Sequence, residues 1–315
     1  MQFYLAPLEG ITGYIFRNAV HDCFGGFDKY FIPFISPNQK GHFSAREKQD
    51  LLPEHNKGMY AVPQILTNSV EDFLSTAKRL AEYGYEEVNL NLGCPSRTVV
   101  TKGRGAGFLG FPEKLQQFLE RIFCSCPLKI SIKTRLGVET SEEFAELLKI
   151  YNQYPMEELI IHPRVQKDFY RNKPDIAAFE KAWTERQNKI CYNGDVFTKE
   201  DVRRIRKQFP DLECMMCGRG ILMNPSLMRE AQGGKYLDKE ELKQFHDQIY
   251  TNYQKVLFGE KTVLFKMKEL WTYLAPLFTD SKKYAKKIKK SVYFHAYEEA
   301  VEALFTEQEI RRQTQ

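Results

Sequence analysis

Short runs of apolar residues recur along the chain as far as residue 217 and predict eight β-strands. Several of these runs are continuously apolar, which is typical of strands that are covered on both faces, as in a parallel sheet. The predicted strands lie near residues 2–6, 29–35, 60–65, 87–92, 128–134, 158–162, 189–193 and 213–217. The pattern of hydrophobic and polar positions therefore indicates one large sheet.

Helical patterns with recognisable start signals lie between these strands. Ser69, with Asp72 three residues later, begins an amphipathic stretch that ends at Gly84. Pro112 suits the first position of another helix, because its missing N–H costs nothing there. Further helices are predicted to begin at 140–141, 174–175 and 198. The chain thus repeats a strand-and-helix unit.

Eight such units predict an α/β fold, a (β/α)8 TIM barrel, which takes about 250 residues. An open doubly wound sheet is the alternative, but the glycine-rich dinucleotide fingerprint after its first strand is missing. After Gly233 and Gly234 only helical periodicity follows, over residues 238–312. We predict a catalytic barrel domain over residues 1–235 and a smaller C-terminal helical-bundle domain over residues 236–315.

Composition and charge refine this picture in one place. The 315 residues are 43% hydrophobic, which excludes a disordered chain, and no apolar stretch is long enough to predict a membrane span or a secretory signal. The formal net charge of +5 is small. However, residues 243–290 contain eleven lysines and four acidic residues, a local excess of seven positive charges. The predicted helical domain therefore carries a concentrated basic segment.

The seven cysteines are odd in number and lie mostly in apolar segments. In a chain of this length they predict reduced thiols and a cytoplasmic protein, not a disulfide framework. Cys214 and Cys217 have a spacing that occurs in metal sites, but residues three apart in a strand point to opposite faces. We expect no metal site.

Polar residues occupy the carboxyl ends of seven predicted strands, where barrel enzymes carry their chemistry. A single histidine after a strand is more often structural, but a lysine inside a strand needs a partner, so Lys133 is predicted to face an anion or a polar ligand. Gly194, Gly218 and Gly220, with Arg219, follow the last two strands, at the common phosphate site of this fold. The barrel mouth is therefore predicted to bind a phosphorylated cofactor or substrate.

Cys94 lies directly beyond a strand, between Gly93 and Pro95. A thiol there can act as a nucleophile or as a proton donor, although a small apolar filler at a turn is an equally good interpretation. The loop that follows, residues 96–107, contains three glycines and is predicted to be flexible. It carries Arg97, Lys102 and Arg104, whose alternative interpretation is an ordinary solvated loop.

The order of these motifs resembles the tRNA-dihydrouridine synthases, which are FMN-dependent barrels with a C-terminal helical domain. The resemblance spans nearly the whole chain, and its most specific part is Asn89-Leu90-Asn91-Leu92-Gly93-Cys94-Pro95. The other matching segments are Ala6-Pro7, Gly10, Thr12, Gln64, Lys133 to Gly137, His162 to Arg164, Asn193 to Asp195 and Gly218 to Gly220. Leu8 and Pro163 stand where methionine and glycine are commoner, so the subfamily and the target uridine are not predicted.

The resemblance implies a reaction and a set of roles. Reduced FMN would transfer a hydride to C6 of a uracil, Cys94 would donate a proton to C5, and NADPH or NADH would supply the electrons. Asn91 would hold the uridine beside the flavin. The residues implied in FMN binding are Ala6, Pro7, Leu8, Gln64, Lys133, His162, Asn193, Gly194, Asp195, Gly218 and Arg219.

A base within folded RNA must leave its stack to reach this mouth, and its phosphates need a cationic surface. The residues predicted to bind the tRNA substrate are Asn91, Arg97, Lys102, Arg104, Arg135, Arg164, Lys286, Lys287, Lys289 and Lys290. On a helix the last four lie close together, although a solvated helix face would look the same. No membrane association and no obligate protein partner are expected, and we predict a monomer.

Two alternatives remain open at this stage. A flavin barrel acting on a small molecule, similar to dihydroorotate dehydrogenases or ene reductases, would share the phosphate loops without needing the basic helical domain. A non-enzymatic RNA-binding protein on a retired barrel would need the basic domain without Cys94.

Overall fold

The computed structural model describes residues 1–37 and 42–311 of the chain. Its strands form one closed parallel barrel, in which each strand pairs with the next and the last pairs with the first. The strands are β1 (Gln2–Leu5), β2 (Lys29–Ile35), β3 (Ala61–Ile65), β4 (Glu87–Leu92), β5 (Lys129–Arg135), β6 (Leu159–His162), β7 (Ile190–Tyr192) and β8 (Cys214–Cys217). The predicted (β/α)8 barrel is confirmed, and the strand ends differ from the predicted ones by at most one residue.

The chain divides into two compact units. The barrel unit consists of Met1–Pro7, Asp28–Asp195 and Arg206–Cys217, and it contains all eight strands. The helical unit consists of Leu8–Phe27, Val196–Ile205 and the chain from Gly218 onward. The predicted C-terminal helical region is present, and a domain boundary at residue 235 remains our proposal. Residues 312–315 of the predicted helical domain lie outside the described residues.

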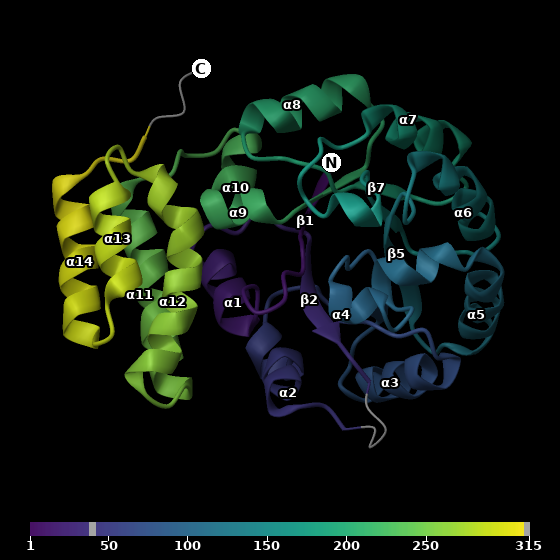
Figure 1. The fold of residues 1–315 in the computed structure, drawn as a ribbon, viewed down its shortest axis with the longest axis horizontal. Coiled ribbons are helices and arrows are strands. Elements are labelled where there is room, and N and C mark those ends of the chain that lie inside the picture. Colours follow the sequence, from purple (N-terminus) through teal and green to yellow (C-terminus); the bar gives the residue numbers. More distant parts are fainter. Residues whose placement is uncertain (38–41, 312–315) are drawn as a thin grey trace. The chain divides into compact units, whose positions relative to one another are not determined.

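Helices surround the strands of the barrel unit (Figure 1). These helices are α2 (Ala45–Leu51), α3 (Val70–Glu82), α4 (Arg97–Val100), α5 (Pro112–Ser125), α6 (Phe144–Tyr151) and α7 (Ile176–Glu185). The predicted start of α3 is confirmed, because the Ser69 hydroxyl accepts a hydrogen bond from the N–H of Asp72 at 3.2 Å. Asp175 caps α7 in the same way through the N–H of Ala178. Local start signals therefore placed these two helices correctly.

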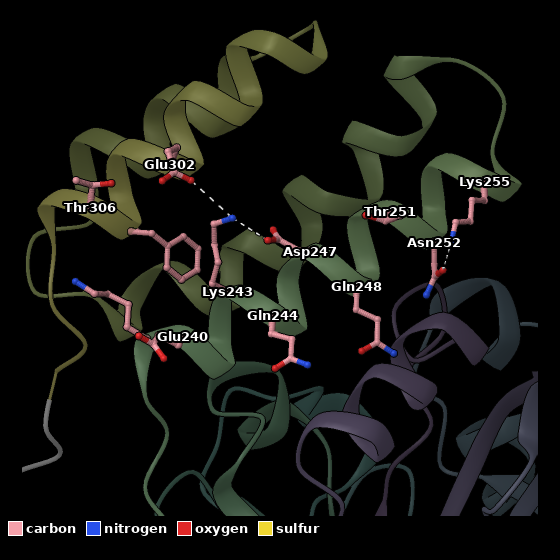
Figure 2. A pocket seen from close by; sticks show the side chains of 12 residues that line it. Glu240, Lys243, Gln244, Asp247, Gln248, Thr251, Asn252, Lys255, Glu302 and Thr306 are labelled. Carbon is pink, nitrogen blue, oxygen red and sulfur yellow. Dashed lines mark hydrogen bonds and ion pairs between the residues drawn. The ribbon is translucent and has the colours of Figure 1, made fainter.

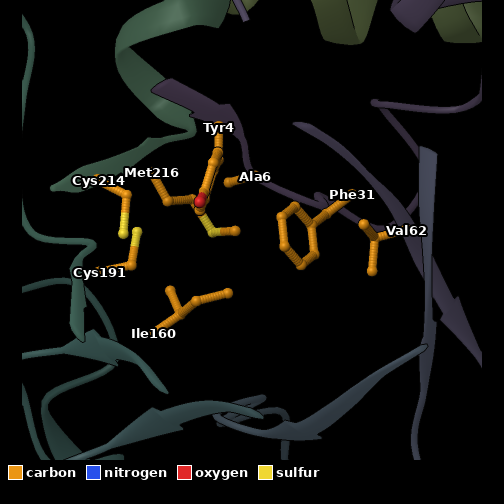
Figure 3. Packing of buried hydrophobic residues seen from close by; sticks show 8 residues of the cluster. All are labelled: Tyr4, Ala6, Phe31, Val62, Ile160, Cys191, Cys214 and Met216. Atoms are coloured by element: carbon orange, nitrogen blue, oxygen red, sulfur yellow. The ribbon is translucent and has the colours of Figure 1, made fainter. Parts of the chain in front are cut away.

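The interior of the barrel is filled by apolar side chains from several strands. Tyr4, Phe31, Val62, Ile160 and Met216 point toward one another across the centre, and Ala6, Cys191 and Cys214 complete the layer (Figure 3). All are at most 4% exposed. Because side chains fill the barrel, its centre is a packed core and any ligand must bind at one end.

A buried ionic cluster closes the amino end of the barrel. The Lys29 ammonium lies 2.7 Å from a Glu87 oxygen and 3.0 Å from a Glu158 oxygen. The two carboxylates are 1% and 0% exposed. Burial lowers the pKa of Lys29, but the charges of Glu87 and Glu158 outweigh burial and raise this pKa above its ordinary value. The ammonium is therefore the counter-ion that allows both carboxylates to be buried.

The helical unit has its own aromatic core. Its helices are α1 (Tyr14–Cys23), α9 (Arg219–Met223), α10 (Leu227–Ala231), α11 (Lys239–Val256), α12 (Glu260–Leu274), α13 (Lys282–Lys290) and α14 (Phe294–Glu307), and α8 (Lys199–Gln208) lies partly in this unit. In the core, the Tyr297 hydroxyl lies 2.6 Å from His246 Nε2 and accepts a hydrogen bond from the Trp271 indole at 2.8 Å. Within the described ranges, no helix has the length and hydropathy needed to cross a membrane.

Candidate active site

The inward faces of β4 and β5 are polar along their whole length. Glu87, Asn89 and Asn91 alternate with apolar residues on β4, so they share one face of the strand. In the register between the strands, Asn89 lies opposite Ser131 and Asn91 opposite Lys133. The two strands therefore carry a polar ladder that runs through the barrel to its carboxyl end, which we call the mouth.

Three amides are joined at the mouth end of this ladder. Asn91 Nδ2 donates to Gln64 Oε1 and Gln64 Nε2 donates to Asn89 Oδ1, both at 2.7 Å. Asn91 Oδ1 accepts from the backbone N–H groups of Gly93 at 3.0 Å and Cys94 at 2.9 Å. The predicted flavin residue Gln64 and the predicted uridine residue Asn91 are thus in direct contact, and Asn91 holds the turn that carries Cys94.

A second support fixes Cys94 from the following loop. The Cys94 carbonyl accepts a hydrogen bond from the N–H of Ala106 at 3.0 Å. A Cβ on Gly105 would lie 2.8 Å from that carbonyl oxygen, so only glycine fits there. The sequence suggested that these glycines make the loop flexible. In the structure Gly105 instead allows the loop to pack tightly against the half-buried Cys94.

Lys133 places an ammonium group beside this amide cluster. Burial and, to a smaller extent, the nearby Arg135 charge lower its pKa to about 8, although the thiols of Cys191 and Cys94 act in the opposite direction. Among the described residues, none is hydrogen-bonded or ion-paired with this ammonium. Lys133 is half-buried, and a cation that is partly removed from water without a counter-ion is costly, so the position fits a negatively polarised ligand.

The Arg135 guanidinium is hydrogen-bonded to backbone carbonyl groups of the chain. Its guanidinium donates to the carbonyls of Gly93 at 2.9 Å, Val165 at 3.0 Å and Phe169 at 2.8 Å. The side chain is 1% exposed. Arg135 therefore fastens the turn after β4 to the segment after β6, and its predicted contact with RNA remains untested.

Arg164, which was also predicted to bind substrate, is bonded to other side chains of the protein. It makes a two-pronged ion pair with Asp195, at 2.9 and 2.5 Å, and donates to His162 Nε2 at 2.9 Å. Because a guanidinium can only donate, His162 Nε2 must accept, and the neutral ring carries its proton on Nδ1. Arg164 and Asp195 therefore set the tautomer of the predicted flavin residue His162.

The glycines after the last strands are surrounded by the chain's own atoms. A Cβ on Gly194 would lie 2.0 Å from the Tyr192 hydroxyl, and Asn193 beside it donates through its side chain to the Met216 carbonyl at 2.8 Å. In the helical unit, a Cβ on Gly220 would lie 2.0 Å from the Val196 carbonyl, and the Arg219 guanidinium lies over the Phe197 ring. Packing against the chain's own atoms is therefore sufficient to require glycine at 194 and 220, without any contact with a ligand.

The remaining predicted residues fall into two groups. At the end of β1, Ala6 lies in the barrel interior and donates its N–H to the Cys217 carbonyl at 2.8 Å, and Pro7 ends the segment. In the helical unit, the Leu8 N–H donates to the Thr12 hydroxyl at 2.7 Å. Arg97 and Lys102 are exposed and Arg104 is half-buried on the loop after Cys94. In the part of the chain that the structure describes, these three cations have no carboxylate partner.

The basic segment forms α13 in the helical unit. Tyr284 and Ile288 are its buried side chains, and its exposed lysines are Lys282, Lys283, Lys286, Lys287, Lys289 and Lys290. Within the described residues, the four lysines predicted to bind RNA form no ion pair. The predicted helix and its cationic face are present, whereas their contact with RNA remains untested.

A wide groove of about 820 Å³ lies along α11 and α14 of the same unit (Figure 2). Acidic and basic side chains line it together, and Lys243 lies 2.8 Å from Asp247 and 3.7 Å from Glu302. Because the lining residues carry charges of both signs, the groove lacks the uniform charge expected of a surface that binds an anion or a nucleic acid. Among the described residues, no group of three or more metal-binding side chains is assembled.

Three residues of the polar ladder, Glu87, Asn89 and Ser131, are not among the site residues predicted from the sequence. A signal was present, because Glu87-Val88-Asn89-Leu90-Asn91-Leu92 and Ile130-Ser131-Ile132-Lys133 alternate strictly. In a strand covered on both faces, such alternation places polar groups inside the barrel.

Comparisons with known proteins add independent findings. A family model described as dihydrouridine synthase matches residues 4–314. The tRNA-dihydrouridine synthase B of Pasteurella multocida is 27% identical over 229 residues, which cover 72% of this chain and 68% of that protein. A probable tRNA-dihydrouridine synthase of Staphylococcus aureus is 26% identical over 264 residues, which cover 80% of this chain and 78% of that protein.

Two solved structures are similar in fold alone. A 2-naphthoyl-CoA reductase has a TM-score of 0.54 at 11% identity, and the match covers 74% of this chain but only 50% of that chain. A morphinone reductase has a TM-score of 0.52 at 12% identity, with coverage of 76% and 87%. This chain therefore spans half the length of the first of these proteins and most of the second.

Proposed function

The chain belongs to the dihydrouridine synthase family, and on this premise we propose that it reduces specific uridines of tRNA to 5,6-dihydrouridine by using bound FMN and Cys94. It is a flavin-dependent oxidoreductase. The observation that carries the proposal is the contact between Gln64, Asn91 and the backbone of Cys94 at the mouth. This contact joins the residues implied in flavin binding, uridine binding and proton transfer.

The residues at the mouth fit a flavin. The Lys133 ammonium, which has no acceptor among the described residues, suits the electron-rich edge of a flavin ring. Gln64, Lys133 and His162 would hold the ring, and the flavin supplies the hydride for C6 of the uracil. Gly194 in the barrel unit is proposed to face its phosphate, and Gly218 and Arg219 remain phosphate contacts predicted from the sequence.

The chain's own groups supply the rest of the reaction. The Cys94 thiol donates a proton to C5, which requires the neutral thiol and not the thiolate. Asn91 offers its remaining N–H to a carbonyl of the uracil, since its oxygen is occupied by two backbone N–H groups. NADPH is the proposed source of electrons. We also infer that the protein is a cytoplasmic monomer, and the reduced thiols expected from its seven cysteines support this location.

Mapping of dihydrouridine in total tRNA, from cells with and without this chain, tests the proposal directly. At least one position is expected to lose its dihydrouridine when the chain is absent. The purified protein is also expected to reduce an unmodified tRNA transcript but not free uracil or a simple enone. Reduction of the small molecules alone would instead favour a barrel oxidoreductase of metabolites.

The basic face of α13 is expected to contribute to tRNA affinity. Replacing Lys286, Lys287, Lys289 and Lys290 by glutamine should weaken tRNA binding and reduce the steepness of log affinity against log salt by about 3. A protein that contacts fewer phosphates releases fewer counter-ions when it binds, and this number sets the slope. The matched control replaces four exposed lysines on the outer helices of the barrel unit, Lys78, Lys114, Lys149 and Lys181. Equal slopes for the two variants would contradict a specific role for α13.

The titration of Lys133 predicts a pH dependence of flavin binding. Its pKa of about 8 in the free protein means that the ammonium is present below this pH and is lost above it. Affinity for reduced, anionic FMN should therefore fall as the pH rises beyond about 8. Lys133→Met should abolish this dependence and weaken binding at pH 7 about 10- to 100-fold. Lys129→Met, at an exposed position of the same strand, is the control.

A further inference from the structure

A continuous chain of hydrogen bonds crosses the interior of the barrel, from the ionic cluster at its amino end to the turn that carries Cys94. We propose that Glu87, Ser131 and Asn89 are positioning residues, which fix the direction of the Gln64 and Asn91 amides and through them the groups offered to the flavin and the uracil. The inference rests on the proposed function of the mouth and assigns a role to residues that do not reach it.

The links of this chain are short and follow one another without a gap. Ser131 Oγ donates to Glu87 Oε1 at 2.7 Å, and Asn89 Nδ2 donates to Ser131 Oγ at 2.9 Å. Gln64 Nε2 then donates to Asn89 Oδ1 at 2.7 Å, and Asn91 Nδ2 donates to Gln64 Oε1 at 2.7 Å. Every link therefore points its hydrogen toward Glu87.

The two ends of the chain determine this direction. At the mouth, the backbone N–H groups of Gly93 and Cys94 can only donate, so Asn91 must present its oxygen to them. At the amino end, burial raises the pKa of the Glu87 carboxyl, whereas the Lys29 ammonium 2.7 Å away favours its ionised form. In that form Glu87 can only accept a hydrogen bond. With a donor at one end and an acceptor at the other, the amides between them cannot be reversed.

The fixed direction decides what the mouth can recognise. A terminal amide has nearly the same shape in its two orientations, so packing alone selects poorly between them. Here Asn91 Oδ1 already accepts two hydrogen bonds and one of its N–H groups is used by Gln64. The single group left for a ligand is an N–H. It fits a carbonyl oxygen, as on uracil, and does not fit an amino group, as on C4 of cytosine.

The burial of the polar ladder residues distinguishes a positioning role from ordinary packing of the core. Glu87, Asn89 and Ser131 are at most 1% exposed, so they act on a ligand only through Gln64 and Asn91. Burying these polar groups costs free energy that an apolar residue would not cost. The neighbouring Val62, which shares the inward face of β3 with Gln64, shows that apolar packing is available at this depth. The polar ladder is therefore a departure from the surrounding core that a positioning role explains.

Ser131→Ala tests the proposal in the complete flavin-loaded protein, with Val62→Ala as the matched control for loss of buried volume. Ser131→Ala removes the link between Asn89 and Glu87, so we expect at least a tenfold loss of kcat for reduction of a tRNA transcript and a shift in the visible absorption of bound FMN. Ser131→Thr keeps the hydroxyl and should recover most of both. Val62→Ala should change kcat and the absorption less than twofold, although it also lowers the unfolding temperature.

A second variant keeps the test independent of folding yield. Asn89→Asp preserves shape but replaces the N–H that faces Ser131 by an oxygen, and it should alter the FMN absorption and kcat as Ser131→Ala does. If both variants resemble Val62→Ala in FMN absorption and kcat, the positioning role is wrong. If the wild-type protein binds FMN but forms no dihydrouridine, the proposed function fails, while the FMN measurements still decide whether the chain orients Gln64.

Discussion

Replacing Cys94 by alanine is expected to lower the rate of dihydrouridine formation by about 10²- to 10⁴-fold, the usual contribution of a general acid. The hydride donor is untouched by this change, but C5 of the uracil loses its proton source. Flavin should remain bound, because the side chains proposed to hold the ring are Gln64, Lys133 and His162. The effect is measured in a single-turnover reduction of a tRNA transcript, in which the oxidation of the bound flavin is the recorded signal.

The matched control is Cys124→Ala, at an exposed cysteine on α5 of the barrel unit. It should retain the full rate, which separates loss of the mouth thiol from loss of any thiol. Cys94→Ser should resemble Cys94→Ala more than the wild type, since a hydroxyl is a much weaker acid than a thiol. A wild-type rate in Cys94→Ala would remove this thiol from the mechanism and leave solvent as the proton donor.

Replacing Lys29 by methionine is expected to cost about 3–5 kcal/mol of unfolding free energy, the range found when one partner of a buried ion pair is removed. The change leaves Glu87 and Glu158 without the ammonium that contacts both of them. Urea denaturation at pH 7 measures the loss. The loss should shrink at lower pH, because buried carboxylates that have lost the Lys29 ammonium have raised pKa values, and the folded state then takes up protons as the pH falls.

Two controls accompany the Lys29 variant. Lys129→Met removes an exposed lysine from the same unit and should change the unfolding free energy by less than about 1 kcal/mol. The triple variant Lys29→Met with Glu87→Gln and Glu158→Gln removes all three charges and should recover much of the stability. If Lys29→Met alone is as stable as the wild type, the cluster does not depend on its ammonium.

Most of the barrel could be predicted from the sequence because its signals are local. A buried parallel strand appears as a short apolar run, and each run is bounded by residues that stop it, so the ends of β4 and β2 were placed correctly. Helix α1 was missed since it begins after Gly13, which offers no side-chain cap. Helix α2 has a capping box between Ser44 and Glu47 that was present in the sequence and overlooked.

The site was predicted only in part, because local sequence shows what a residue is and not what it contacts. Cys94, Lys133 and Gln64 stood out at strand ends, and the structure brings them to one mouth. Arg135 and Arg164 looked like cations available to RNA, but their guanidinium groups bind carbonyls of the chain and Asp195. Val165 lies 30 residues from Arg135 and Asp195 lies 31 residues from Arg164, and nothing near the arginines in the sequence identifies these partners.

The sequence by itself determined the eight strands, the residues at their carboxyl ends and the basic α13, because each depends on short-range periodicity and on residue type. Only the tertiary structure decided which polar groups are paired. The bond between Lys29 and Glu87 and that between Asn91 and Gln64 join residues 58 and 27 positions apart. Such contacts follow from closure of the barrel and from the register of its strands, which bring inward side chains of neighbouring strands, such as β3 and β4, and of strands further apart, such as β2 and β4, together in the interior.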